Sequence, residues 1–172
     1  MFSIQLAIVF LILQFIYLII MKKILLSLSF ITCMGSLAFA QIENPVKWNF
    51  SAKKISATEY ELHLTATLDK TWHMYAQDAG EGPEPTSIAF TANPLLKYNG
   101  KVKEVGKLTK EFDANFNSVL KFYGDKVDFV QKVTVKAGVP TVAKGNITYM
   151  VCNNNKCLPP KAIPFSIKIG GK

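Results

Sequence analysis

The chain contains no arginine: all 20 of its basic side chains are lysines, against 12 acidic side chains. Arginine supplies the planar, bidentate donors with which proteins most often recognise phosphates and base edges. The lysines are spread along the whole sequence, which is typical of a solvated surface. Nucleic acid is therefore not expected as a partner.

The sequence also lacks the motifs of several enzyme classes. There is no Gly-x-Ser-x-Gly turn for a nucleophilic serine and no glycine-rich loop that would cradle a phosphate. Only two histidines are present, and neither has a serine and a carboxylate in the same segment. His63 falls on the polar side of an alternating segment, and we interpret it as a surface residue. No cofactor is expected.

The first 40 residues differ from the rest of the chain. Residues 21–40 combine two lysines, an apolar stretch and a small-x-small ending at Ala38-Phe39-Ala40, which is typical of a secretory signal peptide cleaved before Gln41. A lipoprotein signal needs a small residue directly before a cysteine, and Ile31-Thr32 precede Cys33, so a lipid anchor is not expected.

A second apolar run covers residues 1–20 and is roughly long enough to cross a bilayer. Only Met21-Lys22-Lys23 separates it from the next run, which leaves no room for a turn and would bury two ammonium groups. We interpret residues 1–20 as an upstream extension, with Met21 as the true start; an anchor helix is the alternative.

Removal of the leader leaves 172 − 40 = 132 residues, enough for one domain with its own core. It carries 18 lysines and 12 acids, a net charge of 18 − 12 = +6. We expect residues 41–172 to form this domain, to be exported and to have no stable insertion in a membrane.

Beyond residue 45 the apolar residues recur with a period of two rather than with helical spacing. The clearest case is residues 60–68, whose odd-numbered side chains are polar and whose even-numbered ones are apolar. About eight short strands and no helix predict an all-β, immunoglobulin-like antiparallel β-sandwich. The segments are 46–50, 54–55, 60–68, 71–76, 86–90, 127–135, 146–151 and 163–169.

Three local signals refine this pattern. Asn99-Gly100 predicts a hairpin with a type I′ turn. Residues 108–118 are polar but include two phenylalanines, which predicts a loop whose aromatic rings either return to the core or form a contact or lid. Pro164 has no backbone donor, so the last strand is expected at a sheet edge.

With Cys33 in the leader, Cys152 and Cys157 are the remaining cysteines, and four residues separate them. An exported protein lies where disulfides persist, and this spacing suits a bridge across the end of a hairpin. A staple of this length adds about 2 kcal/mol or less. A structural disulfide and a redox-active pair both stay open, whereas a metal site with His63 and His73 is weakly supported because those histidines lie on different predicted strands.

At this point the sequence shows a family resemblance. Tyr149-Met150-Val151-Cys152 and Cys157-Leu158-Pro159-Pro160, followed by an alternating last strand, resemble the active-site region of the amino-terminal periplasmic domain of the thiol:disulfide interchange protein DsbD. The likeness extends over most of residues 45–169. In the family the cysteines typically enclose five residues, and here they enclose four.

The resemblance implies roles for individual residues. Cys152 and Cys157 would be the catalytic pair, with Cys157 facing the partner and Cys152 resolving the mixed disulfide. His73 and Tyr75 would flank the disulfide, and Lys156 would modestly favour the thiolate. An acidic and aromatic cap loop would cover the site until a partner displaces it. The cap residues are Glu111, Phe112, Asp113 and Phe116, and the Phe122-Tyr123 pair is an alternative match to the cap.

The resemblance also implies partners. The family domain takes electrons from the membrane-embedded part of its protein through a thioredoxin-like domain and passes them to oxidised periplasmic proteins, including factors of cytochrome c biogenesis. Those other parts are not in this chain, so we expect a free-standing domain that borrows a thioredoxin-like or DsbD-type membrane electron donor. The alternative is an immunoglobulin-like binding module with a purely structural disulfide.

Overall fold

The structure, a computed structural model, describes residues 13–26, 43–114, 116–136 and 139–170. It divides into two units, Met1–Glu43 and Asn44–Lys172. In the first unit, residues 13–26 form a helix with exposed side chains. Within the described ranges, no helix has both the length and the apolar character needed to span a membrane. Residues 1–12, Cys33 and the expected cleavage site lie outside these ranges, so the predicted domain boundaries stay predictions.

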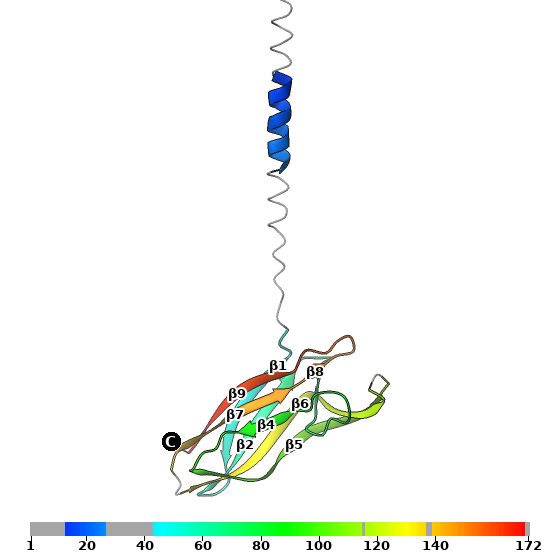
Figure 1. The fold of residues 1–172 in the computed structure, drawn as a ribbon. Helices are drawn as coiled ribbons and strands as arrows, with labels where there is room; N and C mark the ends of the chain where they lie inside the picture. The colour runs from blue at the N-terminus through cyan, green and yellow to red at the C-terminus, as the bar shows by residue number, and fades with distance from the viewer. Residues whose placement is uncertain (1–12, 27–42, 115, 137–138, 171–172) are drawn as a thin grey trace, which may run out of the picture. The chain divides into compact units, whose positions relative to one another are not determined.

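The second unit is built from strands, and nine are present in its described residues. Their order along the chain can be followed in Figure 1. The strands are β1 (Val46–Lys54), β2 (Glu59–Leu68), β3 (His73–Tyr75), β4 (Ser87–Phe90), β5 (Leu96–Asp113), β6 (Ser118–Val135), β7 (Thr141–Tyr149), β8 (Val151–Cys152) and β9 (Lys161–Ile169).

These strands form two antiparallel sheets that share one core (Figure 1). In the six-stranded sheet, β1 pairs with β2, and β2 and β3 pair with successive parts of β6. β8 pairs with β3, and β5 pairs with β6 along its opposite edge. The three-stranded sheet has the order β4-β7-β9. The prediction of an all-β, immunoglobulin-like antiparallel sandwich is therefore confirmed.

The core follows the period-two pattern of the sequence. In β2 the side chains of Leu62, Leu64 and Ala66 have no exposed surface, whereas His63 and Thr65 between them are half-buried. The apolar face of β2 packs in one cluster with Phe129 of β6 and residues of β7 and β9. Full burial of a leucine or phenylalanine side chain stabilises the fold by about 1.5–3 kcal/mol.

The position of the last strand is also as expected. β9 pairs with β7 alone and lies at the edge of the three-stranded sheet. Pro164 stands opposite Asn146 in this pairing. An edge strand tolerates proline because one of its sides has no partner strand that needs a donor.

Two local predictions are wrong. Asn99-Gly100 does not reverse the chain, because β5 continues through it to Asp113. Gly100 has a φ of 72° and lies where the β5–β6 register shifts between Asn99 and Lys103. The positive φ angle that suggested a hairpin turn therefore serves a bulge.

The segment 108–118, expected as a loop, is mostly strand. Its first part completes β5, Ala114 and residues 116–117 lie in the connection, and Ser118 begins β6. The end of this hairpin extends beyond the sandwich (Figure 1). The strand there has no fully buried face, so its sequence lacks the alternation by which strands are recognised.

Gly145 of β7 offers a test of how tightly this strand packs against its neighbours β4 and β9. A Cβ atom there would lie 2.5 Å from Cζ and 2.8 Å from Cε1 of Phe165, and would also press on the backbone oxygen of Ala89. We expect Gly145→Ala to lower the free energy of unfolding by about 1–3 kcal/mol through overpacking. Urea denaturation measures this change.

Gly124→Ala is the matched control. The nearest atom to a Cβ at Gly124 is the backbone oxygen of Trp72, at 4.0 Å. This variant should change the free energy of unfolding by less than about 1 kcal/mol. Equal effects of the two substitutions would contradict the packing argument.

Candidate functional site

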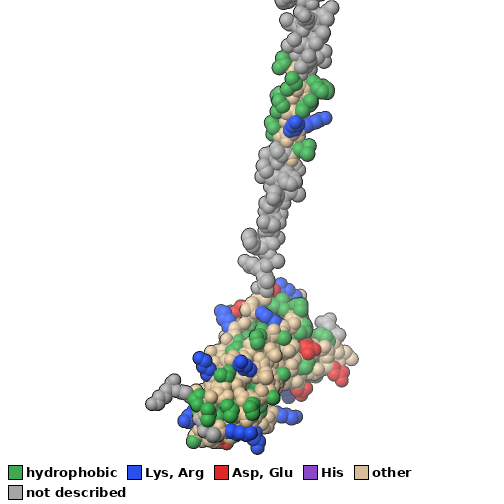
Figure 2. Space-filling model, turned by 60° about the vertical axis from the view of Figure 1, so that its left-hand side comes forward, with side chains coloured by type: hydrophobic (Ala, Val, Ile, Leu, Met, Phe, Trp, Pro, Cys, Tyr) green, Lys and Arg blue, Asp and Glu red, His purple; other side chains and the backbone are tan. Residues whose placement is uncertain are grey.

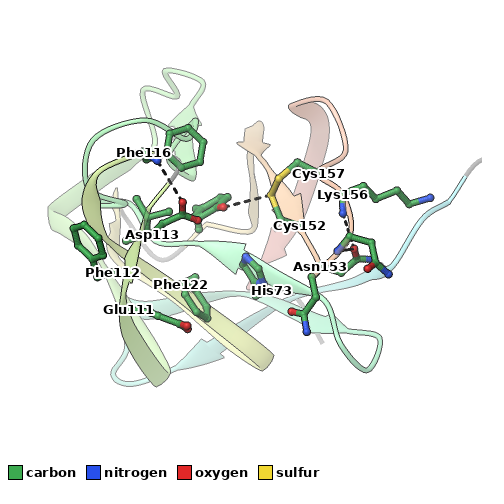
Figure 3. Close-up of a pocket in the computed structure, with 14 residues that line it drawn as sticks. His73, Glu111, Phe112, Asp113, Phe116, Phe122, Cys152, Asn153, Lys156 and Cys157 are labelled. Atoms are coloured by element: carbon green, nitrogen blue, oxygen red, sulfur yellow. Dashed lines mark hydrogen bonds between the residues drawn. A yellow bond between two sulfur atoms is a disulfide. The ribbon is translucent and has the colours of Figure 1, made fainter.

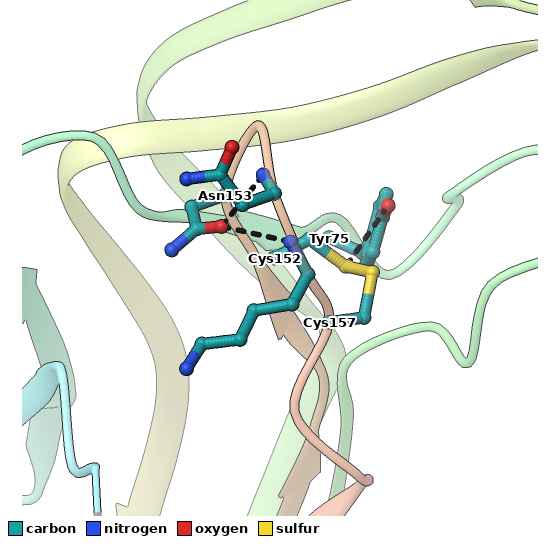
Figure 4. Close-up of a disulfide and its surroundings, with 6 residues drawn as sticks. Tyr75, Cys152, Asn153 and Cys157 are labelled. Carbon is teal, nitrogen blue, oxygen red and sulfur yellow. Dashed lines mark hydrogen bonds between the residues drawn. A yellow bond between two sulfur atoms is a disulfide. The ribbon is translucent and has the colours of Figure 1, made fainter.

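Cys152 and Cys157 form a disulfide, with their Cα atoms 4.0 Å apart (Figure 4). Cys152 ends the short strand β8 and is 2% exposed. Cys157 lies beyond a tight tip and is exposed. The two sulfur atoms therefore belong to residues of very different accessibility.

The tip between the cysteines is held by Asn153. Its Oδ1 atom accepts hydrogen bonds from the backbone N–H groups of Asn155 and Lys156, both at 2.9 Å, and its own N–H donates to the oxygen of Lys156 at 2.9 Å (Figure 4). Beyond the second cysteine, the N–H of Leu158 donates to the oxygen of Val151 at 2.9 Å. The turn is thus closed by hydrogen bonds as well as by the disulfide.

Strand β3 forms one wall of the site. His73 is the cross-strand partner of Cys152, so the two side chains leave the sheet on the same face. Tyr75 lies two residues further along that face, and its hydroxyl donates to Sγ of Cys152 at 3.4 Å. Met74 between them points to the other face and is completely buried in the core. The disulfide therefore lies on the face of the sheet opposite the core.

The end of the β5–β6 hairpin forms the other wall. Phe122 pairs with Tyr75, and Leu120 pairs with Glu111, so these side chains face the same way as the disulfide. The ring of His73 lies 4.4 Å from that of Phe122 and 5.5 Å, edge-on, from that of Tyr75.

Between these walls lies a cavity of 470 Å³ (Figure 3). Every residue that the sequence pointed to as part of the site lines it: Cys152, Cys157, His73, Tyr75, Lys156, Glu111, Phe112, Asp113 and Phe116. Their placement around one cavity is a structural finding. Their roles in catalysis and capping stay predictions.

Other lining residues were not among the expected site residues, although Phe122 belongs to the alternative match to the cap. Leu120, Phe122 and Asn153 to Asn155 also line the cavity. Phe122 is brought there by the pairing of β3 with β6, which no local pattern indicates. Asn153 could have been suspected, because an asparagine at the start of a short polar tip often bonds to the backbone two residues on.

The segment expected as a cap loop has a different structure. Glu111 to Asp113 end strand β5, and Phe116 lies in the turn, where its N–H donates to Oδ1 of Asp113 at 3.3 Å. Phe112 is 60% exposed and Phe116 39% exposed. Cys157 stays exposed with the hairpin in this position.

Burial and nearby acids shift the pKa values of the two β3 side chains. Burial lowers the pKa of His73 below its ordinary 6.5, and the charge of Glu111 partly opposes this. Burial raises the pKa of Tyr75, and Asp113 raises it further. The acids of the hairpin therefore act electrostatically on the residues beside the disulfide.

Most acidic side chains visible in Figure 2 gather at the hairpin end of the domain, while lysines are scattered over the rest.

The structure does not bring the two histidines and two cysteines together as metal ligands. His63 lies elsewhere on the sheet, with Nδ1 2.7 Å from Oδ2 of Asp128. In the part of the chain that the structure describes, no group of three or more His, Cys, Asp or Glu side chains could hold a metal ion.

Comparisons with known proteins agree with this fold. Residues 41–167 match the family model described as "Thiol:disulfide interchange protein DsbD, N-terminal". The structure is similar to the N-terminal periplasmic domain of ScsB from Proteus mirabilis, with a TM-score of 0.50 and 17% identity, over 75% of this chain and 47% of that one. The chain thus spans about half the length of that relative. No curated protein matches the sequence significantly.

Two structures from Neisseria meningitidis are also similar. The reduced DsbD N-terminal domain has a TM-score of 0.49 and 16% identity, over 74% of this chain and 87% of that one. A complex between the DsbD and PilB N-terminal domains has a TM-score of 0.46 and 13% identity, over 73% and 87%.

Replacement of Asn153 by alanine should make the disulfide easier to reduce. Without the Oδ1 acceptor the dithiol form gains freedom, so its two sulfur atoms meet less often. Two hydrogen bonds of about 0.5–1.5 kcal/mol each correspond to a rise of roughly 20–60 mV in reduction potential. Equilibration with glutathione buffers measures it. Asn153→Asp keeps the acceptor and should lie closer to the unsubstituted protein; an equal shift in both variants would contradict the role of Oδ1.

The lowered pKa of His73 predicts a pH-dependent stability. Between the folded-state pKa and 6.5 the unfolded chain binds more protons, so this residue's contribution is complete above pH 6.5 and is lost as the pH falls through the folded-state pKa. His73→Gln should weaken the fall in stability on acidification, as measured by urea denaturation from pH 8 to 5. His63→Gln leaves His73 in place and should keep the part of the pH dependence that His73 causes. Identical pH profiles of His73→Gln and the unsubstituted protein would refute this.

Proposed function

The chain belongs to the family of the DsbD amino-terminal domain, and from this premise we propose that it relays reducing equivalents through Cys152 and Cys157. The electrons would come from a thioredoxin-like or DsbD-type membrane donor and pass to oxidised periplasmic proteins. The observation that supports the proposal is the asymmetry of the disulfide. Cys157 is exposed, Cys152 is buried, and both line one cavity.

Reduction of the pair then has a defined order. A thiolate of the donor attacks Sγ of Cys157, the accessible sulfur, and the electron pair of the broken disulfide leaves on Sγ of Cys152. A second donor thiolate attacks the donor's own sulfur in the mixed disulfide and releases the Cys157 thiolate. The donor leaves as a disulfide, having given two electrons, and the two released thiolates take up the two protons that the donor thiols lost.

Transfer to a client runs in the opposite direction. The Cys157 thiolate attacks the client disulfide, and one client sulfur leaves as a thiolate. The thiolate of Cys152 then attacks Cys157 and re-forms the disulfide, which releases the second client thiolate. Cys152 needs no access to the client for this step, in agreement with its burial.

Neighbouring groups act on both sulfur atoms. The hydroxyl of Tyr75 already donates to Sγ of Cys152 and would stabilise the thiolate that leaves on it. Lys156 lies in the tip beside Cys157 and would favour the exposed thiolate by its charge. Glu111 and Asp113 oppose this by adding negative charge to the cavity.

Export fits the same proposal. The family match begins at residue 41, the residue that would follow the predicted signal peptide cleavage. We propose that the mature domain works in the periplasm, where it meets oxidised clients, among them factors of cytochrome c biogenesis.

The order of attack can be tested with single cysteine variants. A thioredoxin that keeps only its nucleophilic cysteine is activated as a mixed disulfide with thionitrobenzoate, and release of the coloured thiolate reports attack. Cys152→Ala leaves the exposed Cys157 and should react about tenfold or more faster than Cys157→Ala, which leaves the buried Cys152. The Cys152→Ser, Cys157→Ser double variant is the blank. Faster reaction of Cys157→Ala would reverse the assigned roles.

The reduction potential separates exchange from a structural disulfide. A relay pair should have a potential above roughly −300 mV, in the range of thiol exchange proteins. A potential well below that value, together with no mixed disulfide from either variant, would favour the binding module with an inert staple.

A further inference from the structure

His73 lies directly opposite Cys152. The pairing of β3 with β8 makes the two residues cross-strand partners, on the face of the sheet that carries the disulfide. Directly opposite residues of an antiparallel pair have Cβ atoms about 4.5–5.5 Å apart, a gap that a thiol and an imidazole together span. Figure 3 shows His73 beside Cys152 at the edge of the cavity. The imidazole is therefore within reach of the buried sulfur.

The other neighbours of His73 leave its ring nitrogens available. Its partner on β6 is Gly124, which has no side chain. Its ring lies 4.4 Å from the ring of Phe122, with an angle of 37° between the two planes. A contact through the ring face does not use the nitrogens, whose hydrogen bonds lie in the plane of the ring.

The buried sulfur needs a proton acceptor. To re-form the disulfide, Cys152 must attack Cys157 as a thiolate. Cys152 is only 2% exposed, and burial disfavours the charged form of a thiol. Water also has little access to a side chain so buried. A group inside the cavity that takes the proton would therefore make this step easier.

Four other titratable side chains share the cavity with His73, and none of them suits this task. They are Tyr75 of the same strand, Glu111 and Asp113 of β5, and Lys156 of the tip. Carboxylates are poor acceptors for the proton of a thiol, whereas a phenol and an ammonium group already hold their protons at neutral pH. Of the described side chains that line the cavity, His73 alone is of a type that titrates close to neutrality.

The surroundings of His73 suit a ring that takes up a proton and gives it back. Burial lowers its pKa below the ordinary 6.5, so the imidazole is neutral and able to accept a proton at pH 7. The charge of Glu111 acts in the opposite direction and favours the imidazolium once it has formed. A thiol beside a histidine that is itself next to an acidic group is a known arrangement for activating a nucleophile.

We propose that His73 is a catalytic residue of the exchange: its imidazole accepts the proton of the Cys152 thiol as Cys152 attacks Cys157, and returns a proton to Cys152 when the pair is reduced. The proposal rests on the thiol relay proposed above. The proton transfer itself belongs to this domain and is tested without a relay partner.

The step balances in both directions. In the mixed disulfide with a client, Sγ of Cys152 gives its proton to a ring nitrogen of His73. The electron pair left on Sγ attacks Sγ of Cys157, and the client sulfur leaves as a thiolate that takes up a proton. When a donor reduces the pair, the electrons of the broken disulfide leave on Sγ of Cys152, and the imidazolium of His73 supplies the proton.

The test follows two releases of coloured thionitrobenzoate from one reaction. When the reduced domain is mixed with the symmetrical disulfide of thionitrobenzoate, the exposed Cys157 attacks first, at a rate that depends on the reagent concentration. Cys152 then attacks Cys157 and releases the second thiolate at a rate independent of that concentration. At pH 7, His73→Gln should slow the second release about tenfold or more and change the first by less than about twofold.

The pH profile separates proton transfer from a structural effect. In the unsubstituted protein the second release should stay nearly level from about pH 7 upward, where His73 is neutral, until the thiol ionises by itself. In His73→Gln the rate should rise about tenfold per pH unit, as for a thiol with a pKa of about 8.5 or higher. The two profiles should converge at high pH.

Two further variants complete the experiment. His73→Ala leaves space beside Cys152, and added imidazole should restore part of its second release. His63→Gln is the matched control, because Nδ1 of His63 lies 2.7 Å from Oδ2 of Asp128, elsewhere on the sheet. This variant should change neither release. Circular dichroism of each reduced variant verifies that it is folded.

Four results would overturn the proposal. They are an unchanged second release in His73→Gln, a slower release that keeps the pH profile of the unsubstituted protein, a fall of equal size in His63→Gln, and no gain from imidazole in His73→Ala. Failure of the relay would appear separately, as a lack of mixed disulfide with the thioredoxin probe, and would leave both releases from this reagent unaffected.

Discussion

The site depends on the pairing of one three-residue strand, β3, with both β6 and β8. Because side chains alternate along a strand, Met74 enters the core while His73 and Tyr75 face outward. The same alternation in β8 buries Val151 in the core and directs Cys152 to the outer cluster. Core packing therefore fixes the register that places the disulfide beside its neighbours, and a shift of one residue would send Cys152 into the core.

The hairpin wall has a weaker basis. Its tip extends past the sandwich and adds no apolar surface to the main core. Its base is held by backbone hydrogen bonds, by the ion pair of Asp78 with Lys121 and by Leu120, which is buried in a small cluster with Tyr75 and Cys152. Contacts of this kind open at lower free energy than a packed core does.

The sequence allowed the sandwich to be predicted because its strands bury one face, as the alternation in residues 60–68 shows. The site residues were identified from a resemblance anchored on the two cysteines. Strand 108–113 was missed because it buries neither face, and Asn99-Gly100 misled because a positive φ serves bulges as well as turns. Phe122 entered only as an alternative cap residue, and its place beside His73 was missed because pairing between segments distant in sequence leaves no local pattern.

The turn between the two cysteines bears on whether the disulfide is structural or takes part in thiol exchange. A staple is useful where a loop would otherwise be open, but here the side chain and backbone of Asn153 close the turn with three hydrogen bonds. The disulfide of so short a loop adds little stability. Since the turn has hydrogen bonds of its own, reduction need not separate the two sulfur atoms. A pair that stays close in both redox states can re-form its bond quickly, which supports exchange over a structural role.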